Sequence, residues 1–307
     1  MTAAEPRTSP PQPDGRAAAE EASALGHDPV PPDATAAYGG HRDQVIDFYR
    51  PGSAAGGRPA PLIAVLHGGA WRAAYDRAHV SPLAAHLAAR GFAVASVEYR
   101  RGAAPEQRSD EAARAGLAPA GRWPETLDDV AAAIDALPAL ALDALGEQAV
   151  DPRRIVLTGH SAGGHLALWA AARHVLAPDS PWHRPSPPPL RGVVALAPIA
   201  DFTSAIRLGV CSGAVLDLLG GPDHVSGRLP HADPAALLPT GIATTIVHGT
   251  TDNVVPPQVS AAFARAAAVA GEEPTVAWLA GTGHFPLIDP ASGAVEAVAE
   301  EIGQLAW

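Results

Sequence analysis

The stretch that decides the fold is residues 159–163, Gly159-His160-Ser161-Ala162-Gly163, which follows the apolar run 155–157 (IVL) and precedes an Ala/Leu-rich helical pattern. A serine at a sharp strand-to-helix turn is held in a strained backbone that presents its hydroxyl above the sheet. The flanking glycines remove side chains that would collide there, and the following helix directs its positive end toward a developing oxyanion. This context predicts a nucleophilic Ser161; the alternative is that Ser161 only caps the helix.

Outside this stretch, short apolar runs alternate with Ala-rich helical patterns. Continuous apolar runs suit strands that are buried on both faces. Strands that alternate with helices imply an α/β protein with a mostly parallel central sheet covered on both sides. Strands are expected near 45–49, 62–66, 92–97, 155–157, 193–196, 245–247 and 276–279, and helices near 81–89, 125–137, 162–174, 258–270 and 291–305.

The pattern also suggests where the domain begins and where it is interrupted. Residues 1–37 are rich in Ala, Pro, Glu and Asp and have almost no large apolar side chain. Ordering them would cost entropy that burial could not offset, so we expect a flexible tail. The domain is expected to span 38–307, with insertions at about 102–122, 175–189 and 201–239 that build a lid or pocket.

Residues 67–71, HGGAW, directly follow the apolar run 62–66. Two glycines let main-chain N–H groups approach a substrate oxygen and point at it. We therefore expect an oxyanion hole formed by the N–H groups of Gly69 and Ala70, joined by that of Ala162 after the nucleophile. The alternative is an ordinary tight turn after a strand.

A serine nucleophile needs a histidine base and a carboxylate that orients it. His284 lies in GTGHF (281–285), a glycine-rich loop soon after the run 276–279, and is the best candidate base. His248 ends the preceding strand and is expected to be a structural histidine.

Asp252 is the candidate acid, because it lies in a loop between a buried strand and a helix. A loop aspartate there can accept a hydrogen bond from the imidazole while it stays ionised. Its rivals are Asp201, which follows the strand near 193–196, and Asp289, whose following proline makes it a natural cap for the last helix.

With these elements in place, the chain resembles the α/β-hydrolase superfamily, and within it the esterases and formamidases with an HGG-type oxyanion loop. The resemblance spans about residue 44 to the C-terminus and implies a sheet of about eight strands. VEYR (97–100), WP (123–124) and HSAGGHL (160–166) look like kynurenine formamidase and its small-substrate esterase relatives, including acetyl and feruloyl esterases. Ala70 stands where many hormone-sensitive-lipase esterases have a third glycine, which leaves group membership open.

Composition excludes several other functions. The formal net charge is -11 and no basic run is present, which argues against a nucleic-acid partner. One cysteine, Cys211, allows no disulfide within the chain, and the 13 histidines show no metal-ligand spacing. No run reaches the roughly 18 apolar residues of a membrane helix and residues 1–15 lack the apolar core of a secretory signal, so we expect a cytoplasmic protein without membrane insertion.

Five further residues have roles that the motifs do not assign. Trp71 and Trp123 could line a substrate pocket or pack its rim. His165 lies four residues beyond Ser161 on the same helical face, where core packing is expected. Asp129, together with Asp128, is expected on a solvated helix face.

The sequence therefore predicts a serine hydrolase that cleaves small carboxylic ester or amide bonds through an acyl-enzyme, with no cofactor and no metal. One alternative is an arylformamidase similar to kynurenine formamidase. Another, of a different class, is a non-catalytic ligand-binding protein that keeps this fold. The sequence does not predict the oligomeric state.

Overall fold

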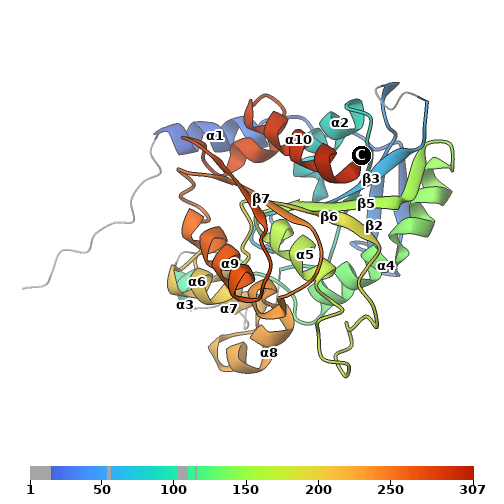
Figure 1. The fold of residues 1–307 in the computed structure, drawn as a ribbon. Helices are drawn as coiled ribbons and strands as arrows, with labels where there is room; N and C mark the ends of the chain where they lie inside the picture. Colours follow the sequence, from blue (N-terminus) through green and yellow to red (C-terminus); the bar gives the residue numbers. More distant parts are fainter. Residues whose placement is uncertain (1–14, 54–56, 103–109, 115) are drawn as a thin grey trace, which may run out of the picture.

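The computed structural model describes residues 15–53, 57–102, 110–114 and 116–307. Its centre is an eight-stranded sheet with helices on both faces (Figure 1). The strand order is β1-β2-β4-β3-β5-β6-β7-β8, and every pairing from β4 to β8 is parallel, whereas β1 and β2 are antiparallel to their neighbours. The strands are β1 (Ala34–Ala37), β2 (Val45–Tyr49), β3 (Ala60–Leu66), β4 (Ala93–Val97), β5 (Val150–His160), β6 (Leu190–Leu196), β7 (Thr244–Gly249) and β8 (Thr275–Leu279). The predicted fold class and strand number are confirmed.

The central strand β3 shows why these apolar runs form a covered sheet. All seven of its residues are buried, and successive side chains of a strand point to opposite faces. Leu62 and Leu66 pack into one hydrophobic core, and Ile63 and Val65 pack into the other. The two cores therefore lie on opposite sides of one sheet.

Each core is covered by its own set of helices (Figure 1). One set consists of α1 (Gly15–Leu25), α2 (Ser81–Ala89) and α10 (Ala294–Ala306), and the other of α4 (Glu125–Leu145), α5 (Ala162–Ala171) and α9 (Pro257–Val269). The remaining helices are α3 (Asp110–Arg114), α6 (Phe202–Arg207), α7 (Ala214–Leu218) and α8 (Val225–Ala232), and the 3-10 helices are η2 (Arg77–Val80), η4 (Pro222–His224), η5 (Pro234–Leu237) and η6 (Phe285–Ile288).

The prediction of a flexible tail over 1–37 is wrong for residues 15–37, and residues 1–14 lie outside the described part. Residues 15–25 form α1, and β1 pairs antiparallel with β2. Two polar side chains fasten this segment to Asp289: Ser23 Oγ donates to it at 2.6 Å, and His27 Nε2 lies 2.7 Å away. These long-range bonds stabilise a segment whose own composition offers little apolar surface.

The expected insertions differ in their structure. Much of 102–122 lies outside the described residues, and 175–189, which is fully described, contains no helix or strand. Residues 201–239 fold into α6, α7, α8 and two 3-10 helices. This segment contacts the first insertion where the Ala120 N–H donates to Asp217 at 3.1 Å.

Among the described residues, no helix combines the length and the apolar character that crossing a membrane requires.

We predict that Gly163→Ala lowers the free energy of unfolding by about 1–3 kcal/mol, as overpacking does. A Cβ at this position would lie 2.0 Å from the Leu66 carbonyl oxygen and 2.5 Å from that of His67, so the backbone must shift. The matched control is Gly227→Ala in α8, where a Cβ meets no atom within 4 Å and better helix propensity adds up to about 1 kcal/mol. Urea denaturation of both variants tests this, and equal stabilities would contradict it.

Candidate active site

Ser161 lies at a strained turn between β5 and α5. Its φ is 57° and its ψ is -117°. Residues other than glycine rarely adopt this backbone conformation, and where they do, it often marks a functional site. Its N–H donates to the Leu196 carbonyl at 2.8 Å, which anchors the turn on β6. The side chain makes no capping hydrogen bond to α5, so helix capping does not account for this serine.

The glycine loop that follows β3 lies directly against this turn. A Cβ built on Gly68 would lie 3.5 Å from the Ser161 Cβ and 2.9 Å from the His160 carbonyl oxygen. Gly69 has a φ of 97° and Ala70 a φ of 52°, so the backbone turns sharply after Gly68. In the described residues no hydrogen bond uses the N–H of Gly69 or Ala70, which leaves both donors available beside Ser161.

The Ala162 N–H belongs to the first turn of α5, where helix geometry provides no intrahelical acceptor. The structure therefore brings the three predicted oxyanion donors to one edge of the sheet.

His284 and Asp252 form a buried pair. His284 Nδ1 lies 2.6 Å from Asp252 Oδ2, and the Asp252 Oδ1 atom accepts hydrogen bonds from the N–H groups of Val254 and Val255, each at 2.9 Å. Burial raises the pKa of Asp252, but His284 and His248 outweigh burial and hold that pKa below its usual range. An ionised Asp252 accepts a hydrogen bond from Nδ1–H and leaves the other nitrogen, Nε2, free to act as a base.

The two rival aspartates lie elsewhere. Asp201 caps α6 by accepting a hydrogen bond from the Ser204 N–H at 2.6 Å. Asp289 bonds to the N-terminal segment through Ser23 and His27. Neither carboxylate bonds to His284.

Two histidines that support this pair were not assigned to the site from the sequence. The ring of His160 lies 4.3 Å from that of His284. Burial, followed by the charge of His284, lowers the pKa of His160 well below its usual value. The ring is therefore neutral, and its Nε2–H donates to the His284 carbonyl at 3.1 Å. In the sequence, the one indication that His160 belongs to the site is that it directly precedes Ser161.

His248 is the second of these. It was expected to be structural, and its Nδ1 lies 2.7 Å from the Ser260 hydroxyl while its Nε2 lies 2.9 Å from the Val255 carbonyl. That same nitrogen is also 3.3 Å from Asp252 Oδ2. His248 therefore lies against the same Asp252 oxygen, Oδ2, that His284 contacts.

The two predicted pocket tryptophans lie in different surroundings. Trp71 is fully buried, and its ring meets His165 edge-on at 5.1 Å and Phe202 at 6.1 Å. The expected core position of His165 is confirmed, since it is 0% exposed and its Nε2 lies 2.9 Å from the Ala232 carbonyl. The ring of Trp123 instead contacts Trp182 at 5.2 Å, and Arg228 lies over it at 5.0 Å.

In the part of the chain that the structure describes, no group of three or more His, Cys, Asp or Glu side chains is arranged to hold a metal ion.

The chain is similar in sequence to proteins that are named as esterases. The chain is 27% identical over 259 residues to a protein named "Probable carboxylic ester hydrolase LipM" from Mycobacterium tuberculosis, covering 79% of this chain and 53% of LipM. The chain thus spans about half the length of this curated relative.

Two solved structures share the fold. A truncated carbohydrate esterase from gut microbiota has a TM-score of 0.67 at 22% identity, covering 91% of this chain and 99% of the other. An inhibited esterase B from Lactobacillus rhamnosis has a TM-score of 0.69 at 19% identity, covering 94% and 93%. The model of the BD-FAE family matches residues 46–266, and the chain therefore has the α/β-hydrolase fold and belongs to the BD-FAE family.

Proposed function

We propose that this protein is a serine esterase that hydrolyses small carboxylic esters through an acyl-enzyme, with Ser161 as nucleophile, His284 as base and Asp252 as the orienting acid. The observation that carries the proposal is the 2.6 Å contact between His284 Nδ1 and Asp252 Oδ2, formed at the same sheet edge as the strained Ser161. A nucleophile, a base and an orienting carboxylate are the combination that acyl transfer requires.

The reaction proceeds in two halves. Ser161 Oγ attacks the ester carbonyl carbon while His284 Nε2 takes the hydroxyl proton, and the carbonyl π electrons move onto its oxygen. When this tetrahedral species collapses, the alkoxide leaves with the proton from His284, and an acyl-Ser161 remains. A water molecule, deprotonated by His284, then attacks the acyl group and releases the acid and free Ser161.

The oxyanion of both tetrahedral species needs preorganised donors. We assign these to the main-chain N–H groups of Gly69, Ala70 and Ala162. The positive end of α5 adds to their effect because the helix dipole favours negative charge at its N-terminus. Trp71, which directly follows Ala70, is our candidate for a wall of the acyl pocket.

The substrate class rests on the relatives. LipM is named as a carboxylic ester hydrolase, and the relatives from rice and Arabidopsis thaliana are named as methylesterases. These names favour an ester over the formamide that the sequence resemblance left open. No step requires a cofactor or a metal ion, so the only partner in this proposal is a small-molecule ester.

We predict that Ser161→Ala abolishes hydrolysis of p-nitrophenyl acetate and butyrate, with kcat reduced by about 10⁴-fold or more because no other group forms the acyl-enzyme. The wild-type protein should be inactivated by a fluorophosphonate with label found on Ser161. Turnover by Ser161→Ala at the wild-type rate would refute the assignment.

We predict that Asp252→Asn lowers kcat by about 10⁴-fold, because an amide at this position favours the wrong tautomer of the imidazole.

The pH dependence of stability gives an independent check on Asp252. The lowered pKa of Asp252 contributes stability above the pKa of an unfolded aspartate, about 3.9, and this contribution is lost as the pH falls through the lower folded pKa. The stability difference between wild type and Asp252→Asn, from urea denaturation, should therefore shrink from pH 7 to pH 3; a constant difference would contradict an ionised, paired Asp252.

A further inference from the structure

A buried carboxylate that the proposed reaction does not use lies beside the glycine loop. Glu98 directly follows β4 and is 2% exposed. Its Oε1 atom accepts from the Tyr99 N–H at 3.0 Å and from Arg101 Nη1 at 2.5 Å, and its Oε2 atom accepts from the Arg77 N–H at 3.1 Å. Burial raises the pKa of Glu98, but His67 and Arg101 outweigh burial and lower that pKa to about 2, so the carboxylate is ionised.

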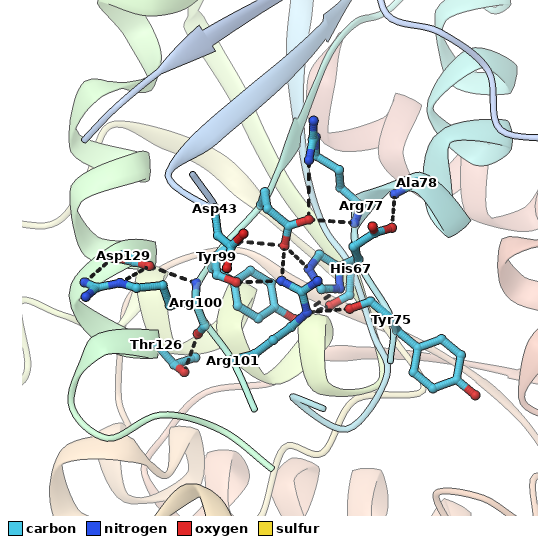
Figure 2. A network of polar contacts seen from close by, with 12 residues as sticks. Asp43, His67, Tyr75, Arg77, Ala78, Tyr99, Arg100, Arg101, Thr126 and Asp129 are labelled. Atoms are coloured by element: carbon cyan, nitrogen blue, oxygen red, sulfur yellow. Dashed lines mark hydrogen bonds and ion pairs between the residues drawn. The ribbon is translucent and has the colours of Figure 1, made fainter. Parts of the chain in front are cut away.

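The same carboxylate contacts the first residue of the glycine loop. His67 Nε2 lies 2.9 Å from Glu98 Oε1, and both side chains are almost fully buried. The imidazole is stacked on the Tyr99 ring, with centroids 4.2 Å apart and planes 8° apart. The Tyr99 hydroxyl donates to the His67 carbonyl at 2.7 Å. Figure 2 shows His67, Tyr99, Arg77 and Arg101 gathered in this one network.

The other ring nitrogen of His67 reaches into the loop. His67 Nδ1 lies 2.9 Å from the Gly68 carbonyl oxygen. A carbonyl and a carboxylate can only accept hydrogen bonds, so each of the two ring nitrogens of His67 faces an acceptor. The neighbouring ring of His79, 5.8 Å away, is neutral near pH 7, because burial and then the charge of His67 lower the pKa of His79 to about 4.

This contact fixes the direction of one peptide group. A trans peptide is planar, so its C=O and N–H point in opposite directions. When the Gly68 carbonyl is held toward His67, the Gly69 N–H on the same peptide points away from His67. A peptide between two glycines rotates with little steric cost, and Gly69 already has a φ of 97°. A side-chain hydrogen bond to the Gly68 carbonyl, such as that from His67, therefore restricts this peptide to one orientation.

We propose that Glu98 and His67 are positioning residues that lock the Gly68–Gly69 peptide so that the Gly69 N–H faces the substrate oxyanion. This inference rests on the proposed function, because it names what prepares the oxyanion hole of that same site. The carboxylate holds the imidazole, the imidazole holds the Gly68 carbonyl, and the planar peptide transmits that constraint to the donor. Neither side chain touches the reacting atoms.

The first test compares Glu98→Gln with Asp129→Asn. Asp129 is a matched control: it is equally buried, with 0% exposure, and it binds Arg100 and Gln44 without contacting the glycine loop. Both variants should lose thermal stability. Only Glu98→Gln should lower kcat for p-nitrophenyl acetate, by about tenfold or more, with KM within about twofold, because a misplaced donor weakens transition-state binding rather than ground-state binding. Equal kcat values for the two variants, once corrected for folded protein, would overturn the proposal.

The second test separates the two ends of the imidazole. In His67→Asn the amide nitrogen replaces Nδ1 and can still donate to the Gly68 carbonyl, whereas in His67→Gln it replaces Nε2 and can reach only Glu98. We expect His67→Asn to retain a kcat at least about fivefold above that of His67→Gln, with active sites counted by fluorophosphonate titration. A kcat for His67→Gln equal to or above that of His67→Asn would overturn the role of the Gly68 contact.

Ser161→Ala separates this inference from the function on which it rests. Turnover that survives in Ser161→Ala contradicts the serine esterase itself. Turnover that requires Ser161, together with Glu98→Gln behaving like Asp129→Asn, contradicts only the positioning role.

Discussion

The close contact between the first turn of α5 and the end of β3 is the constraint on which the site depends. β3 and β5 pair in parallel with Leu66 opposite Gly159, so the chain leaves both strands at the same edge of the sheet. Only a residue without a side chain fits at Gly163, because a Cβ there would lie 2.0 Å from the Leu66 carbonyl oxygen. That contact places the glycine loop beside Ser161, so the proposed oxyanion donors and the proposed nucleophile lie next to each other.

The polar groups of the site all follow strands that end at this edge. His67 follows β3, Glu98 follows β4, Ser161 follows β5, and the loops after β7 and β8 supply Asp252 and His284. Ligands of open α/β sheets bind at the carboxyl ends of the strands. Buried charges are costly unless they are paired, and the two buried carboxylates that lie nearest this edge in our account, Glu98 and Asp252, are each paired with a histidine. The network around His67 thus follows strands on one side of β5, and the His284–Asp252 pair follows strands on the other side.

The sequence was sufficient to predict the sheet and the pairing of His284 with Asp252, because apolar runs mark buried strands and glycine-rich loops mark their ends. It was insufficient where a segment is held by distant partners. Residues 15–25 bury only Ala24, and the bonds that hold α1 join Ser23 and His27 to Asp289, more than 260 residues away. The expectation that Asp129 of α4 is solvated is wrong for the same reason: Arg100, in the segment after β4, binds both of its oxygens.

The most direct test of the convergence of Ser161, the glycine loop and His284 is a crystal structure of the protein after reaction with a small alkyl fluorophosphonate. We expect phosphorus bonded to Ser161 Oγ, and the phosphonyl oxygen about 2.7–3.1 Å from the main-chain nitrogens of Gly69, Ala70 and Ala162. His284 should lie within hydrogen-bond distance of Ser161 Oγ. A phosphonate on another residue, or a phosphonyl oxygen directed away from the Gly69 nitrogen, would contradict this convergence.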